Sequence, residues 1–179
     1  MTIHVYGSWL RGDPRGWRSR HHREHVDGDY KNPPPKGKYD AIYARSKKLM
    51  KRAPIKIATD LRQFVANMFA EKLRTDQIEV LIISADAKHV HILARFPDHN
   101  PRYWIGWAKK YVTQTVKAHS PAVGLNLASG DGLWAKRSHP EPIESRPPTP
   151  HLRVHPRPRQ RGGKIWRFDK PSSPEKAHG

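Results

Sequence analysis

Two histidines lie one residue apart in the segment KHVHILARF, Lys88–Phe96. Hydrophobic residues alternate with them, which is typical of a β-strand, because successive side chains of a strand point to opposite faces. His89 and His91 are therefore expected side by side on one face. The other face would carry the apolar side chains of Val90, Ile92, Ala94 and Phe96. Two neighbouring imidazoles can share one divalent metal ion, whose other ligands would be water and a substrate phosphate.

The same pair has plainer interpretations, which the residues leave open. An exposed sheet face is wet, and polar side chains belong there. A histidine-triad nucleotide hydrolase would need a third histidine where Leu93 stands, and an RNA-binding sheet of the RRM type would need aromatic residues on this strand. His4 shares a strand face with Tyr6 near the start of the chain and is a candidate for a further metal ligand.

Charge is the dominant feature of the composition. The 179 residues include 34 Lys and Arg against 16 Asp and Glu, for a formal net charge of +18. Such a surface attracts polyanions, above all nucleic acid. Cysteine is absent, which excludes disulfides and thiolate metal sites. No apolar run approaches the roughly 18 residues of a membrane span, and the start lacks the apolar core of a signal peptide, so a cytoplasmic protein with access to DNA is expected.

The hydrophobic periodicity predicts an α+β fold. Strands are expected at Thr2–Leu10, Ile78–Ala85, His89–Phe96 and Gly132–Ile143, and amphipathic helices at Thr59–Thr75 and Asn100–His119. The order βαββαβ predicts a ferredoxin-like domain, a four-stranded antiparallel sheet with both helices on one face. Pro140 and Pro142 confine the last strand to a sheet edge.

The domain is expected to span residues 1–143. Within it, residues 11–57 are expected to be largely a basic loop or arm, and residues 144–179 an irregular Pro/Arg-rich tail. Eight basic residues are candidates for phosphate contacts in DNA: Arg11, Arg15, Arg18, Arg20, Lys109, Lys110, Lys136 and Arg137.

Several segments together resemble a known family. The His-hydrophobic-His ("HUH") pattern in HVHILARFP, with GSWLRGDPRGWRSRHHREH, PRYWIGWAKK and GLWAKRSHPEPI, resembles the insertion-sequence-200-like transposases and the related REP-associated tyrosine transposases. The resemblance covers about Ile3–Ile143. It implies that His89 and His91 hold a divalent cation, magnesium or manganese, which polarises the scissile phosphate of single-stranded DNA.

The resemblance also implies a covalent mechanism and a set of partners. A tyrosine on a helix after the last strand attacks the phosphate, which leaves a 5′-phosphotyrosine link and a free 3′-OH. The substrates would be single-stranded or hairpin DNA, and the enzymes would work as homodimers. The expected location is the cytoplasm of a bacterial-type cell, in association with the nucleoid.

The expected nucleophile is missing from this chain. None of its six tyrosines follows Tyr111. Tyr111 is therefore the candidate that remains, but it belongs to the apolar stripe of the second helix, and this position predicts packing against the core, away from the histidines. Two alternatives to the transposase function therefore stay open. The chain could be a catalytically inactive nucleic-acid-binding remnant, or a metal-dependent nuclease that uses water as its nucleophile.

The tail offers a reason for the missing tyrosine. Codons for PPTPHLRVHPRPRQR, Pro147–Arg161, can be chosen so that the frame shifted by one base reads HQLHTFAYIHAHANE, which resembles the tyrosine helix of the family. As written, five prolines forbid a helix there. A pair of compensating frameshifts, or a genuine extended tail that contacts phosphates, would each account for this segment.

Resequencing the gene from the codon of Glu144 through that of Trp166 separates these two accounts. Under the frameshift hypothesis the bases will spell the tyrosine helix. Wobble bases that cannot encode that helix would establish Pro147–Arg161 as a genuine tail without a nucleophile.

Overall fold

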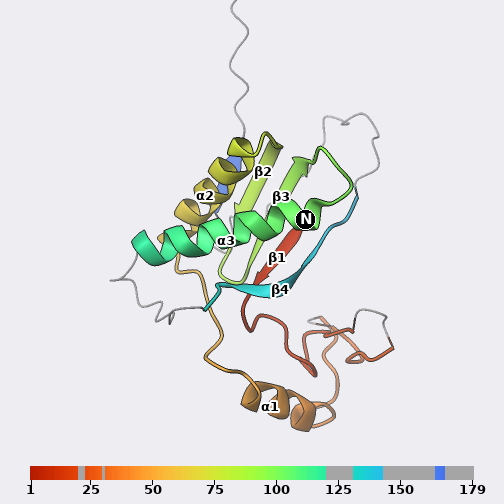
Figure 1. Cartoon of the computed structure of the whole chain (residues 1–179). Helices are drawn as coiled ribbons and strands as arrows, with labels where there is room; N and C mark the ends of the chain where they lie inside the picture. Colours follow the sequence, from red (N-terminus) through yellow and green to blue (C-terminus); the bar gives the residue numbers. More distant parts are fainter. Residues whose placement is uncertain (20–22, 30, 120–130, 143–163, 168–179) are drawn as a thin grey trace, which may run out of the picture.

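The computed structural model describes residues 1–19, 23–29, 31–119, 131–142 and 164–167 (Figure 1). Its elements, in chain order, are β1 (Thr2–Val5), α1 (Asp40–Lys48), α2 (Leu61–Thr75), β2 (Glu79–Ala85), β3 (His89–Arg95), α3 (Pro101–His119), β4 (Trp134–His139) and β5 (Lys164–Arg167).

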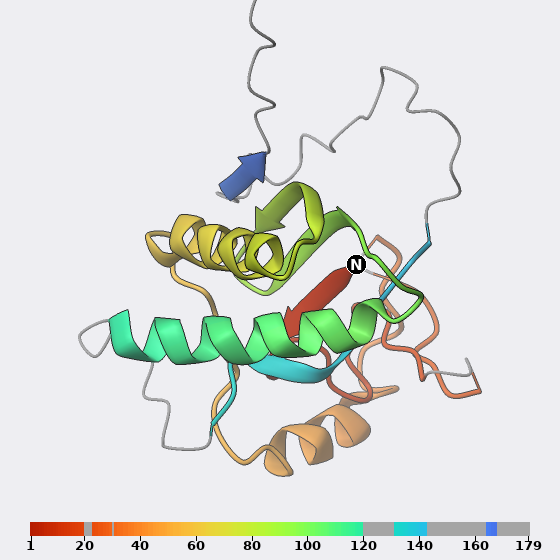
Figure 2. The same cartoon turned by 45° about the horizontal axis from the view of Figure 1, so that its top comes forward.

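One antiparallel sheet carries the fold, with strand order β4-β1-β3-β2-β5. Its first four strands have the order of the ferredoxin-like arrangement, and α2 and α3 lie together on one side of them (Figures 1 and 2). The predicted fold class is therefore confirmed. The last strand of the predicted set, β4, is at a sheet edge, as its following prolines indicated.

The core lies between the sheet and these two helices. Ile3 and Val5 of β1 and Val90 of β3 are completely buried. Their neighbours along the strands, His4 in β1 and His89 and His91 in β3, are not buried. In α2 the apolar residues recur at helical spacing, and Phe69 is completely buried, with its ring 5.2 Å from that of Trp134. This alternation turns one face of the sheet toward the helices and leaves the other face for polar side chains.

Two elements were not predicted. Helix α1 lies inside the segment expected to be largely loop, and none of its residues is buried, so it has no apolar stripe that could have indicated a helix. Strand β5 corrects the prediction that the whole of 144–179 is irregular, since Lys164–Arg167 pairs antiparallel with β2. Four residues are too few for a periodic signal. Residues 143–163, including the segment of the frameshift hypothesis, lie outside the described residues.

Strand β1 is shorter than the predicted Thr2–Leu10, because the chain turns at Gly7. This glycine has a φ of +77°, and a Cβ there would lie 2.7 Å from Cε of Met50 and 2.9 Å from Cβ of Pro54. Only glycine fits this conformation and this close approach. The turn directs the following residues of the arm toward the end of the sheet at which β3 begins.

The core predicts a large cost for Phe69→Ala. Removing a completely buried phenylalanine leaves a cavity beneath Trp134, and the free energy of unfolding should fall by about 3–5 kcal/mol in denaturant titrations. Leu49→Ala is the matched control, because Leu49 is 74% exposed and its loss should change stability by no more than about 0.5 kcal/mol. Equal effects of the two substitutions would contradict this core.

Candidate functional site

The two histidines of β3 lie on the sheet face opposite the helices. β3 is a central strand, paired with β1 so that His91 is opposite Thr2 and His89 is opposite His4. The ring centroids of His89 and His91 are 4.6 Å apart, with the rings nearly perpendicular. The ring of His4 lies 5.9 Å from that of His89. Strand pairing therefore gathers three imidazoles from two strands on one face.

A carboxylate orients the first of these rings. Oδ1 of Asp86 lies 2.9 Å from Nδ1 of His89 and also accepts hydrogen bonds from the backbone N–H groups of Lys88 and His89. Because Nδ1 of His89 faces the carboxylate, Nε2 remains as the ligand atom of this ring. A carboxylate behind an imidazole is the usual support of a metal-binding histidine, since it fixes both tautomer and orientation.

The electrostatics keep His91 neutral and Asp86 charged. Partial desolvation of the His91 ring by the surrounding atoms, together with the neighbouring His89, lowers the pKa of His91 below its ordinary value. Partial burial by itself raises the pKa of Asp86, but hydrogen bonds from His89 and Lys88 outweigh it and hold that pKa below its ordinary value. A neutral imidazole is the form that binds a metal. Nδ1 of His91 lies 3.1 Å from Oγ1 of Thr2.

As a metal site, this arrangement provides part of a coordination shell. Within the described ranges no group of three or more histidine, aspartate or glutamate side chains is placed to hold a metal ion, so His4 does not complete a three-ligand set. Two adjacent imidazoles, one backed by a carboxylate, nevertheless fit a divalent ion whose other ligands come from water and phosphate. The donor set is compatible with magnesium or manganese bound together with a substrate.

Comparison with known families decides what kind of protein carries this site. A family model described as "Transposase IS200 like" matches residues 48–147, which is more than half of the 179-residue chain. The chain belongs to the IS200-like transposase family. No curated protein and no solved structure matches it at a significant level.

The match includes the histidine pair and Asp86, and it extends from the end of α1 past β4. Strand β1 and most of the arm precede it. A transposase acts on DNA, so the family agrees with the partner expected from the net charge. None of the described helices is both long and apolar enough to cross a membrane.

Two of the candidate basic residues of the arm are held in ion pairs within the protein. Arg11 contacts Glu24 at 2.6 Å, with both side chains more than half exposed. Arg15 is bound to the buried carboxylate of Asp13. Arg18 is exposed, and Arg20 lies outside the described residues.

Among the candidate basic residues of α3 and β4, one is bound within the protein and two are exposed. Lys109 donates to the backbone carbonyl of Ala135 at 2.6 Å, and burial lowers its pKa, so it ties α3 to β4. Lys110 is exposed, with its ammonium 5.3 Å from the ring centroid of Trp107, and Lys136 is exposed on β4. Arg137 lies in β4, and its side chain is outside the described part.

Tyr111 lies on the helix side of the sheet. Its hydroxyl donates a hydrogen bond of 2.6 Å to Glu71 of α2, and this bond raises the pKa of Tyr111. The sheet therefore separates Tyr111 from the histidine pair. Tyr111 is not placed to attack a phosphate held by His89 and His91.

Two residues of the site, Asp86 and Thr2, were not predicted. Asp86 could have been found from its position three residues before His89, in the turn Asp86-Ala87-Lys88, because aspartate in such a turn often accepts backbone hydrogen bonds. No sequence signal indicates Thr2, since its proximity to His91 depends on the pairing of β1 with β3.

The electrostatics of this pair predict an NMR titration measured in chelator. The His91 imidazole should titrate below 6.5 in the wild type. His89→Ala should raise the midpoint of His91, because the substitution removes a like charge and lessens the desolvation of the ring. Asp86→Asn should lower that midpoint, because the substitution removes a negative charge that stabilises the imidazolium. A wild-type midpoint at or above 6.5, or shifts of the same sign in both variants, would contradict the proximity of these three groups.

Proposed function

We propose that this transposase cleaves and rejoins single-stranded DNA by HUH-type chemistry, with His89 and His91 as ligands of a magnesium or manganese ion. The observation that supports it is the pair of adjacent imidazoles on the open sheet face, inside the family match, with Asp86 behind His89. When bound, the ion would supply charge neutralisation at the scissile phosphate.

Each residue around the histidine pair has a separate role in this chemistry. Asp86 contacts Nδ1 of His89 and so orients the ring with Nε2 pointing away from the carboxylate, where it can bind the ion. The low pKa of His91 keeps its ring neutral at physiological pH. The histidines lie on the sheet face opposite the one that buries Val90, and His91 is exposed while His89 is partly exposed, so a DNA strand can approach both rings.

The charge distribution supports a DNA substrate that contacts more than the histidine face. Helix α3 contains no acidic residue in its 19 positions, and Lys110 is exposed on it. Lys136 adds a positive side chain on the adjacent edge strand. We infer that the exposed cations Lys110 and Lys136 contact backbone phosphates, and that Arg11 does so as well, because its ion pair with Glu24 is open to solvent and to an exchanging phosphate. Arg15 and Lys109 support the fold, because their donors are bound to less exposed groups of the protein.

A second function, DNA binding without cleavage, is favoured by the position of Tyr111. The hydroxyl of this last tyrosine is bound to Glu71 on the far side of the sheet. In this alternative the histidine face still binds metal and DNA, but no protein group forms a covalent link.

Cleavage of end-labelled hairpin and single-stranded DNA in Mn²⁺ or Mg²⁺ tests the proposal. The proposal predicts metal-dependent nicking and a covalent protein–DNA adduct on denaturing gels, in which the linked residue is one other than Tyr111. His91→Ala should reduce nicking at least about 100-fold, because a ligand is lost, and should leave most of the salt-sensitive binding intact. His99→Ala is the matched control, since His99 is an exposed histidine outside the site, and it should cut like the wild type.

The other outcomes identify the alternatives. Cutting without an adduct would replace the tyrosine mechanism by attack of water. A salt-sensitive mobility shift without any cutting would establish the binding-only function. Loss of DNA binding in His91→Ala would show that the site has been assigned to the wrong step.

A further inference from the structure

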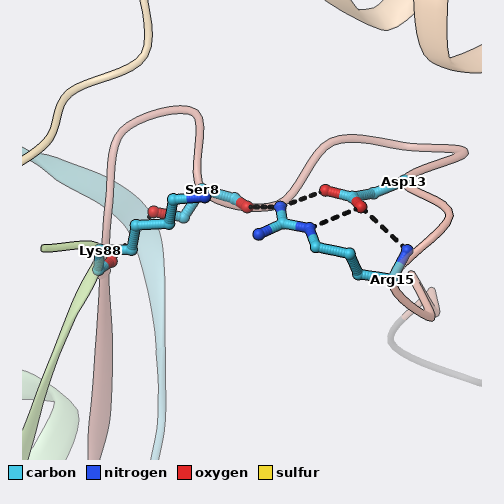
Figure 3. A network of polar contacts seen from close by, with 4 residues as sticks. All are labelled: Ser8, Asp13, Arg15 and Lys88. Atoms are coloured by element: carbon cyan, nitrogen blue, oxygen red, sulfur yellow. Dashed lines mark hydrogen bonds and ion pairs between the residues drawn. The ribbon is translucent and has the colours of Figure 1, made fainter. Parts of the chain in front are cut away.

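The turn that follows β1 is bound to Lys88 at the start of β3 (Figure 3), and Lys88 directly precedes His89. Oγ of Ser8 donates a 2.9 Å hydrogen bond to the carbonyl of Lys88, the residue before His89. The backbone N–H of Val5 donates to the same carbonyl at 2.9 Å. The position of the turn is therefore coupled directly to the backbone that carries His89.

A buried ion pair makes this turn rigid. The carboxylate of Asp13 is almost completely buried and accepts hydrogen bonds from the backbone N–H of Arg15 and from its Nε at 2.8 Å. Nη2 of Arg15 donates to the same carboxylate and to the carbonyl of Ser8 at 2.7 Å. Burial alone raises the pKa of Asp13, but Arg15 outweighs it and keeps the carboxylate ionised. One guanidinium thus joins both ends of the turn.

The residue that this turn presents is Trp9, whose side chain is 44% exposed. The guanidinium carbon of Arg15 lies 5.0 Å from the centroid of its ring. The ring of His4 lies 6.2 Å away in an edge-on orientation. Since His4 is next to His89, and His89 is next to His91, the indole is the end of a row of four rings along the open face.

Holding a large apolar ring in a fixed, exposed position brings little stability, because nearly half of its surface stays in water. The same arrangement suits a nucleobase, whose flat apolar face stacks on an aromatic ring, most favourably when that ring is already ordered. The neighbouring Arg15 adds positive charge, and the histidines at the other end of the row are the proposed position of a phosphate. The features of Trp9 are therefore those of a base-binding subsite.

We propose that Trp9 binds one unpaired nucleobase of the DNA strand, next to the phosphate at His89 and His91. Arg15 covers one face of the indole, and the base stacks on the opposite face. Stacking reads no hydrogen-bond pattern, so the subsite accepts different bases and positions the strand rather than its sequence. This inference rests on the proposed function, since it places the base relative to the histidine pair. The turn lies outside the residues matched by the family model.

The test measures the binding of oligothymidylate, in chelator so that no cleavage occurs. Trp9→Leu keeps an apolar side chain over His4 but removes the aromatic face, and it should weaken binding about tenfold. Trp9→Phe keeps an aromatic face and should stay within about threefold of the wild type. Both variants should show the thermal stability of the wild type. Equal affinities for the wild type and Trp9→Leu would overturn the proposal, and so would equal losses in Trp9→Leu and Trp9→Phe.

Photocrosslinking to oligonucleotides that contain 5-iodouracil locates the base directly. Mass spectrometry should find a crosslink at Trp9. Trp107→Leu is the matched control, because Trp107 is a similarly exposed tryptophan on the helix side, and this crosslink should persist in it. Crosslinks confined to Trp107 or Tyr103 would overturn the proposal.

The two experiments distinguish failure of the proposed function from failure of the base subsite. The cleavage assay needs a divalent metal, whereas the binding assay with oligothymidylate is carried out in chelator. Absence of nicking together with a Trp9 crosslink would contradict the chemistry at the histidines and support the subsite. Metal-dependent nicking that requires His91, without any contribution of Trp9 to binding, would contradict the subsite alone.

Discussion

The alternation of side chains along β3 determines both the core and the candidate site. β3 is the middle strand of the sheet, so its residues must satisfy neighbours on both sides and on both faces. Val90 is completely buried under the helices, and each histidine beside it therefore points to the other face. A shift of one residue in the pairing with β1 would exchange the two sets and bury both imidazoles. Hydrophobic burial on one face thereby fixes the position of polar chemistry on the other.

The two faces of the sheet have different chemical characters as a result. The helix face holds the apolar core and Tyr111 of α3, whose hydroxyl is bound to Glu71. The open face holds a row of imidazoles with a carboxylate behind one of them. Any protein nucleophile for a phosphate on the open face must come from that side, and Tyr111 does not.

The N-terminal arm connects the positive charge of the chain to this face. Part of its charge is structural, because Arg15 neutralises the buried Asp13 and joins it to Ser8. The free-energy cost of burying a carboxylate is offset when the carboxylate accepts hydrogen bonds and is paired with an opposite charge. Arg15 supplies both to Asp13. The arm is consequently an ordered extension of the site at this point, and it brings Trp9 within reach of His4.

Sequence periodicity was sufficient for the βαββαβ order and for the orientation of His89 and His91, because long amphipathic helices and an alternating strand carry repeated, redundant signals. It missed α1, which buries no residue, and β5, which is only four residues long. Composition indicated that the arm is basic, but it could not separate Arg15, which is bound to Asp13, from Lys110, which is exposed, since both are merely cations in a sequence. What the sequence alone determined is therefore the face on which the histidines lie, a local property of alternation in one strand.

Which residues meet on that face was decided by the tertiary structure. Thr2 and His4 reach the site only through the register of β1 on β3, and Trp9 reaches it only through a turn fastened at Lys88. These contacts join residues about 80 to 90 positions apart, and no local pattern encodes such distances. They exist because strands distant in the chain must pair to satisfy their backbone hydrogen bonds.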